Sequence, residues 1–244
     1  MDLDTLPMRH GFRLRGQDPT RLETFVDAAF AFAVTLLVVS FGAMPDTFAE
    51  LYEALRRLPA FLGGFAVLAL FWHGHYVFSR RYGLEDGTVM LLSMALVATA
   101  LFYVFPLRMV MSAAMHFFTG GWAPRELDVS TVGEFRAVFV LYGVGFAVFA
   151  LINAALYAHA LRHRGALRLD AAEVVMTRSV IGTQAILAAC ALLSAGIALL
   201  LPRMDGWAQA LPGLTYMLLA VLLPWHEIRM QRRADAALAG RIPA

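Results

Sequence analysis

The sequence predicts an all-α polytopic membrane protein with six transmembrane helices, on the basis of its composition and of one recurring pattern. Hydrophobic residues make up 60% of the 244-residue chain and charged residues 16%, against about 45–50% and about 25% in soluble domains. Six uncharged stretches are each long enough to cross a bilayer, which takes about 20 apolar residues. These stretches are approximately residues 28–45, 58–79, 87–107, 137–161, 179–202 and 206–225.

The first stretch is expected to be a transmembrane helix and not a cleaved signal peptide. Asp27 interrupts its start, no A-x-A-like cleavage site ends it, and further apolar stretches follow. Before the second stretch, Thr47 and Glu50 have the spacing of a capping box, so Asp46, Glu50 and Glu53 are interpreted as a helix start. The alternative role for these acids is to concentrate cations at a mouth on the outer side. The last three stretches are assigned to spans on hydropathy alone.

The arginines predict the orientation of the spans, since the chain has no lysine. They cluster before the first span, between the second and third, between the fourth and fifth, and after the sixth. By the positive-inside rule both termini are cytoplasmic. We therefore expect a multi-pass protein of a cell membrane. Its parts are a cytoplasmic N-terminal tail (1–20), a six-helix transmembrane domain (21–228) and a cytoplasmic C-terminal tail (229–244).

Several functional classes find no support in the sequence. The net charge of +2 reflects the topology, and no basic motif suggests nucleic-acid binding. No Ser-His-Asp, H-E-x-x-H, paired-carboxylate or cysteine metal pattern occurs, and Cys190 is the only cysteine. The sequence therefore predicts neither an enzyme nor a protein with a metal or another cofactor.

Three polar residues near the inner ends of the first two spans are expected to meet. Asp27 and His75 lie at similar depths, estimated from the distance of each to the arginines at the inner surface. Trp72 and His75 are three residues apart and share a helical face. A carboxylate near the hydrocarbon needs donors, which an indole N–H and an imidazole supply. We interpret the three as a structural clamp; proton sensing or relay through His75 is an alternative, and metal binding is a weaker one.

A second pattern is a stripe along the first span. Ala28, Phe32, Thr35 and Val39 are spaced four, three and four residues apart, so they share one face of a helix. Small residues in this helix would let copies of it approach closely. By pattern alone, such a seam indicates a packing face.

The residues from 21 to about 110 resemble the transmembrane protein 175 family of endolysosomal potassium channels and their bacterial relatives. Its signature R-x-x-x-F-S-D is matched by Arg21, Phe25 and Asp27, with Val26 in place of the serine. The segment "FWHGH" is similar to the family's F-W-x-x-H and carries Trp72 and His75. "LFYVFPLR" resembles the end of its third helix.

The resemblance implies a homotetramer in the lipid bilayer, with four copies of the first helix lining a pore for monovalent cations, mainly K⁺. Each copy would be a single six-helix repeat, as in the bacterial members of the family, which suggests a prokaryotic plasma membrane. By position, Phe32 falls on an apolar constriction where the family usually has Ile or Leu. Thr35 falls on the threonine one turn further out, and Val39 on the outer apolar ring. The alternatives are a proton-coupled secondary transporter and a non-conducting membrane scaffold that uses the stripe only for packing.

Overall fold

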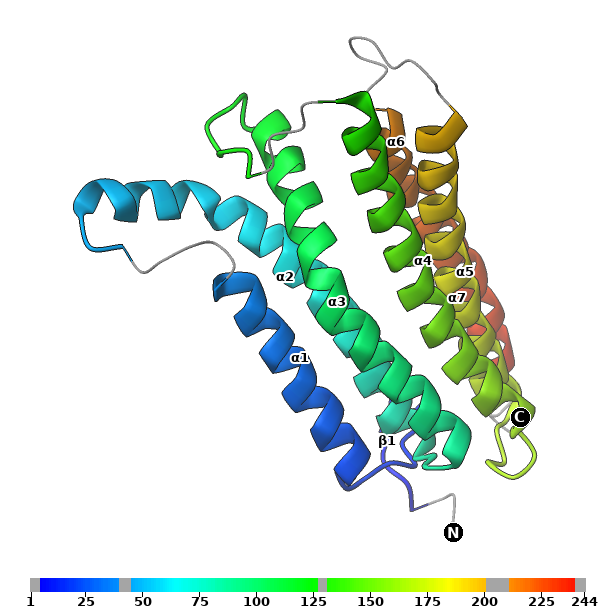
Figure 1. The fold of residues 1–244 in the computed structure, drawn as a ribbon. Helices are drawn as coiled ribbons and strands as arrows, with labels where there is room; N and C mark the ends of the chain where they lie inside the picture. The colour runs from blue at the N-terminus through cyan, green and yellow to red at the C-terminus, as the bar shows by residue number, and fades with distance from the viewer. Residues whose placement is uncertain (1–4, 40–44, 127–130, 201–210, 240–244) are drawn as a thin grey trace.

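The computed structural model describes residues 5–39, 45–126, 131–200 and 211–239, and it is a bundle of long helices (Figure 1). The elements are β1 (Met8–Arg9), β2 (Phe12–Arg13), α1 (Arg21–Val39), α2 (Phe48–Tyr82), α3 (Gly87–Phe118), α4 (Val132–Arg162), α5 (Ala171–Leu200), α6 (Leu211–Leu214), the 3-10 helix η2 (Thr215–Leu218) and α7 (Leu219–Ala239). Six helical segments are long and apolar enough to span a membrane, the last being Leu211–Ala239. The predicted number of spans is confirmed.

The helices extend beyond the uncharged stretches that predicted them. α1 begins at Arg21, so Asp27 lies inside the helix and not at its start. α2 is 35 residues long and includes Pro59. It is longer than the second uncharged stretch because an amphipathic helical segment precedes that stretch. Figure 1 shows that this first part of α2 extends sideways beyond α1. Hydropathy detects the membrane-buried portion of a helix but not its polar extensions.

The bundle has α1 at one edge and α7 at the opposite edge (Figure 1). The beginning of α1 and the end of α7 lie at the same end of the bundle, as six spans require. A hydrophobic core joins α1 through α5, and within it the rings of Phe71 (α2) and Phe149 (α4) stack at 4.3 Å. α3 and α4 approach closely at Gly145, where an added Cβ would lie 2.4 Å from the Tyr103 ring. Close approach at small residues is the usual packing of membrane helices.

The N-terminal segment is docked against the end of the bundle at which α1 begins, which we call the inner end after the orientation predicted from the arginines; the opposite end is called the outer end. β1 and β2 form a short antiparallel hairpin, and Phe12 is completely buried, with its ring 5.5 Å from that of Tyr82. The following chain runs directly on α2, where Gly16 N donates to Arg80 O at 3.1 Å. A Cβ at Gly16 would lie 2.2 Å from Ser79 O, so this contact requires glycine. Residues predicted as a tail are thus part of the folded unit.

The turn between α2 and α3 is fixed by a residue at each helix end. Gly83 closes α2 in the left-handed conformation, with φ of 57°. Asp86 caps α3, accepting from Thr88 N at 2.8 Å and from His159 Nε2 at 2.6 Å. Desolvation acts to raise the pKa of Asp86. The hydrogen bonds from His159 and from the backbone outweigh it, so the pKa lies below its usual value. The carboxylate therefore stays charged at neutral pH and ties α3 to α4.

Replacing Asp86 with alanine should lower the stability of the protein. The substitution removes a helix cap, which typically contributes about 1 kcal/mol, and also the contact with His159. We expect a lower midpoint of thermal unfolding in detergent. Glu85→Ala is the matched control, because Glu85 is exposed and makes no hydrogen bond or ion pair with other described residues. Equal midpoints for the two variants would contradict the assignment of Asp86 as the cap.

Candidate functional site

α1 has one face turned into the protein and one turned away from it. The buried face consists of Glu23, Val26, Phe30, Ala33 and Leu37. The opposite face carries the stripe of Ala28, Phe32, Thr35 and Val39, and all four are exposed in the protomer. The exposed fraction is 55% for Phe32 and 65% for Val39. One protomer therefore leaves this apolar stripe without a protein partner.

Packing fixes which face of α1 is turned outward. Val26 and Phe30 lie in the core shared with α2 and α3. Further out, Leu37 fits against Gly64, where an added Cβ would lie 3.0 Å from the leucine side chain. Val26 occupies the position of the family serine, and its full burial suits an apolar side chain. Rotating α1 to bury the stripe would expose these side chains and leave a gap beside Gly64.

Thr35 is the polar member of the stripe. Its hydroxyl donates to Ala31 O, one turn earlier, at 3.0 Å. A hydroxyl that donates one hydrogen bond still has lone pairs with which to accept others. The stripe thus offers one side-chain oxygen between the apolar groups of Phe32 and Val39, and a cation or a water can bind to it.

Asp27 and Trp72 are in direct contact near the inner end of α1. The indole Nε1 of Trp72 donates to Asp27 Oδ1 at 2.7 Å. Both side chains are half-buried, and the Trp72 ring also stacks on Tyr76 at 5.7 Å. This hydrogen bond gives the carboxylate a donor and connects α1 to α2 at one fixed rotation of each helix.

His75 has a different partner from the one expected. Its Nε2 shares a hydrogen bond of 2.9 Å with Ser93 Oγ on α3, and the side chain is only 1% exposed. Trp72 and His75 lie on the same side of α2, but both α1 and α3 pack there. Trp72 therefore reaches Asp27 on α1, whereas His75 reaches Ser93 on α3. The predicted three-residue clamp is therefore two separate contacts. His75 Nδ1 is buried and has no hydrogen-bond partner among the described residues.

A second polar contact at the base of α1 was not predicted. Arg80, near the end of α2, forms an ion pair with Glu23 in the first turn of α1 and donates to Gln17 O at 2.9 Å. Arg21 and Phe25, which match the family signature together with Asp27, are exposed. Arg21 makes no hydrogen bond or ion pair within the described part of the chain. The sequence did contain a signal for this pair. Glu23 lies in the first turn of α1 and Arg80 in the last turn of α2, so the two opposite charges are at the same depth.

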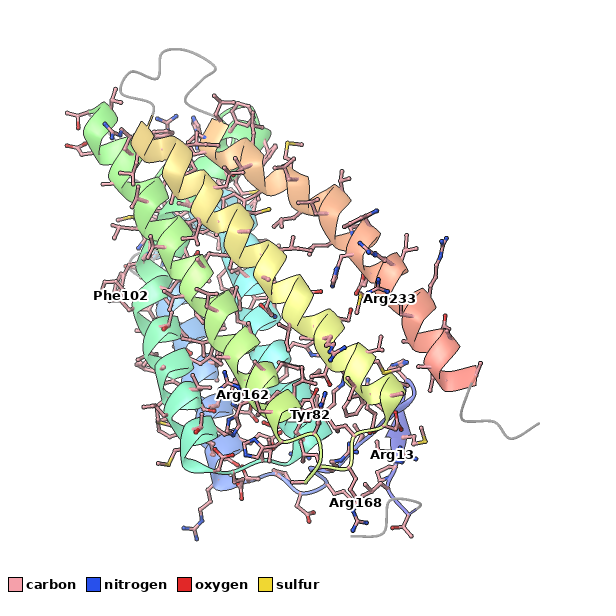
Figure 2. The ribbon with its side chains drawn as sticks, turned by 90° about the vertical axis from the view of Figure 1, so that its right-hand side faces the viewer. Arg13, Tyr82, Phe102, Arg162, Arg168 and Arg233 are labelled. Atoms are coloured by element: carbon pink, nitrogen blue, oxygen red, sulfur yellow. The ribbon has the colours of Figure 1, made fainter. Side chains whose placement is uncertain are left out.

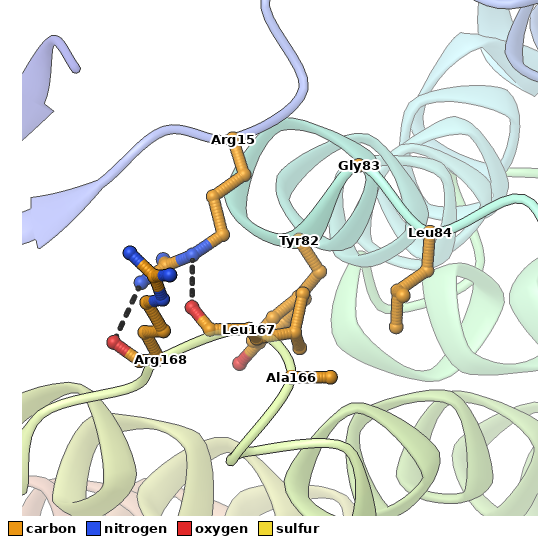
Figure 3. A pocket seen from close by; sticks show the side chains of 7 residues that line it. All are labelled: Arg15, Tyr82, Gly83, Leu84, Ala166, Leu167 and Arg168. Carbon is orange, nitrogen blue, oxygen red and sulfur yellow. Dashed lines mark hydrogen bonds between the residues drawn. The ribbon is translucent and has the colours of Figure 1, made fainter. Parts of the chain in front are cut away.

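The inner end of the bundle also holds a buried ion pair, shown in part in Figure 3. Arg15 binds Glu173 at 2.8 Å and donates to Leu167 O at 2.9 Å. Arg15, Tyr82 and Arg168 are among the residues that line a recess of about 330 Å³ beside this contact (Figure 3). The Arg15 guanidinium donates both to the Glu173 carboxylate and to backbone carbonyls between α4 and α5. The contact therefore joins the N-terminal segment to the α4–α5 connection and to the start of α5.

The acidic residues before the outer part of α2 are occupied locally. Thr47 Oγ1 accepts from Glu50 N at 3.2 Å, as expected for the residue that caps α2. The Glu50 carboxylate accepts from Asp46 N at 2.9 Å and not from Thr47 N, so the predicted capping box is only half formed. Glu53 pairs with Arg56 at 2.7 Å. Across the four described ranges, no three His, Cys, Asp or Glu side chains lie where they could hold a metal ion together.

Comparisons with known proteins agree on one family. Residues 21–104 match the model of "Endosomal/lysosomal potassium channel TMEM175". A potassium channel of Marivirga tractuosa is 34% identical over 213 residues, which cover 85% of each chain. A crystal structure of a variant of the potassium channel MtTMEM175, in complex with a nanobody–MBP fusion protein, superposes with a TM-score of 0.79 at 29% identity. The match covers 93% of this chain and 100% of that one.

Removing the donor of the Asp27–Trp72 contact should destabilise the helix pair. In Trp72→Phe the ring remains but the N–H is lost, which leaves a half-buried carboxylate without its donor and costs about 1–3 kcal/mol. The thermal midpoint in detergent should fall, and combining Trp72→Phe with Asp27→Ala should cost less than the sum of the two single changes. His73→Phe is the control, because His73 is exposed. Additive effects would show that the contact contributes nothing.

Proposed function

The chain belongs to the endosomal/lysosomal potassium channel TMEM175 family, and on that premise we propose that it is a potassium-permeable channel. In this proposal four copies assemble around an axis lined by α1. The observation that carries the proposal is the exposed stripe of Phe32, Thr35 and Val39. The opposite face of α1 is packed against the rest of the protomer, and this packing keeps the stripe turned outward. The known potassium channels to which the chain is similar support this choice of ion.

Phe32 forms the constriction in this proposal. Four phenylalanine rings at one level leave a narrow apolar lumen that expels water, so an ion there loses part of its hydration. Thr35 lies one turn further toward the outer end, where four hydroxyls replace part of the lost water. Val39 forms an outer apolar ring. Ion selectivity then depends on the Thr35 oxygens, and the resting conductance depends on the size of the Phe32 rings.

Contacts at the base of α1 maintain this arrangement. The Trp72–Asp27 hydrogen bond and the Arg80–Glu23 ion pair join α1 to α2 on the side away from the stripe. A rotation of α1 that moved Phe32 from the axis would break both. We assign them a structural role in setting the rotation of α1, and Arg21 and Phe25 belong to the same inner end of the pore helix.

The arginine distribution supports a cell-membrane protein with both termini in the cytoplasm. A secondary transporter would need ionisable groups near the middle of the membrane. The polar side chains midway along the described helices, such as Thr35, Asn153 and Gln184, are uncharged. A non-conducting scaffold remains the alternative that uses the same stripe. Neither a cofactor nor an enzymatic activity is part of the proposal.

Potassium flux into liposomes that contain the purified protein tests the assignment at single residues. Phe32→Ala should widen and wet the constriction, so basal potassium flux should rise severalfold and the preference for potassium over sodium should weaken. Thr35→Val keeps the shape of the side chain and removes its hydroxyl, so it should lower the potassium preference with little effect on assembly.

Two further phenylalanine substitutions serve as controls. Phe102 is 72% exposed and belongs to α3 and not to the proposed pore helix (Figure 2). Phe102→Ala therefore makes the same chemical change outside α1 and should leave flux unchanged. Phe30→Ala should reduce stability, because Phe30 is buried in the core. If Phe32→Ala and Thr35→Val leave flux and selectivity unchanged in normally assembled protein, the stripe is a packing face and the channel assignment of α1 is wrong.

A further inference from the structure

We propose that the outward face of α7 holds the headgroup of an anionic phospholipid at the inner membrane surface. The face consists of Trp225, Ile228, Arg229 and Arg232, which line a shallow recess of about 320 Å³, with Arg233 beside it. The proposed occupant is a lipid such as phosphatidylglycerol, whose phosphate would bind the arginines and whose acyl chains would pack on the apolar side chains. It is separate from the conduction pathway proposed for α1.

The arginines of this face have no acidic partners. Arg229, Arg232 and Arg233 are all exposed, and none forms an ion pair within the described ranges. Arg229 instead lies over the Trp225 ring, with 5.5 Å between the guanidinium carbon and the ring centroid. Asp235 is nearby in sequence, but it also makes no ion pair with a described residue. Three unpaired guanidinium groups on one helix provide a positive charge that an anionic headgroup can neutralise.

A contact between α7 and α5 fixes the depth of these groups. His226 Nε2 shares a hydrogen bond of 3.0 Å with Ser179 O on α5, and Ser179 begins the uncharged stretch of that antiparallel helix. Arg232 lies six residues beyond His226, about 9 Å further along the helix. That step brings it toward the level of Glu173, where α5 carries buried charge. Trp225 therefore lies at the apolar boundary, and the arginines lie beyond it.

This order of groups matches a membrane interface. Tryptophan is enriched where the hydrocarbon meets the headgroups, and arginines just beyond a span attract anionic lipid. The position of α7 agrees, because it lies at the edge of the bundle opposite α1 (Figure 1). If four copies of α1 surround an axis, this edge faces the lipid and not a neighbouring copy. The recess then faces lipid whether the protein is a monomer or a tetramer.

Lipid retention by the intact protein tests the proposal. The purified chain, in detergent, is mixed with equal amounts of dioleoyl phosphatidylglycerol and dioleoyl phosphatidylcholine, and the lipids retained are counted by native mass spectrometry. We expect the wild type to prefer phosphatidylglycerol by at least about fivefold. The double variant Arg229→Gln with Arg232→Gln should retain less than about half of that preference. Arg229→Lys with Arg232→Lys should keep most of it, because the charge remains.

The control is Arg162→Gln with Arg164→Gln. These arginines are exposed at the end of α4, and Figure 2 shows Arg162 well apart from Arg233. The control variant should keep the wild-type preference. The proposal is overturned if the α7 glutamine variant binds phosphatidylglycerol like the wild type, or if the control loses as much. Displacement of the lipid by inorganic phosphate alone would also overturn it, because the site would then be one for a free anion.

Discussion

The rotation of α1 about its own axis is the constraint on which the proposed pore depends. Asp27 is a carboxylate close to the hydrocarbon, where an unpaired charge is costly, and the Trp72 indole supplies its hydrogen bond. On the same side, Val26 and Phe30 fill the core. Together these contacts leave one orientation of α1, in which Phe32, Thr35 and Val39 face outward. The proposed constriction and oxygen ring are both consequences of that orientation.

Polar contacts at the inner end of the bundle hold several helices together. Arg80 and Glu23 connect α2 to α1, Arg15 and Glu173 connect the N-terminal segment to α5, and Asp86 and His159 connect the start of α3 to α4. Helices in a membrane gain little from burying apolar surface against each other. Paired polar groups at the membrane edge therefore add specificity that apolar packing alone does not provide. A further ion pair joins Arg108 within α3 to Glu126 in the segment that follows this helix.

Much of the architecture could be predicted from the sequence, because the need for about 20 apolar residues per span leaves a strong signal. Helical periodicity also places the residues of the stripe on one face, and depth brings Asp27 near Trp72; both are local properties. Periodicity alone indicated a packing face, and only the family resemblance implied that the stripe faces away from the protomer. The partner of His75 could not be predicted in this way. A helical face identifies a direction, but which neighbour lies in that direction depends on how α1 and α3 pack around α2. The docking of Phe12 and the pairing of Arg15 with Glu173 join segments distant in sequence, and hydropathy contains no information about such contacts.

The proposed position of the stripe at a fourfold axis can be tested directly with Cd²⁺, which is held tightly when several cysteine thiolates surround it. Thr35→Cys, made in a Cys190→Ala background, places four thiols at one level if α1 lines the axis. Cd²⁺ added to liposomes containing this variant should then block potassium flux. Leu37→Cys, on the buried face of α1, should be insensitive. Flux through the Thr35→Cys variant that is unaffected by Cd²⁺, or block of both variants alike, would contradict the placement of this stripe in the pore.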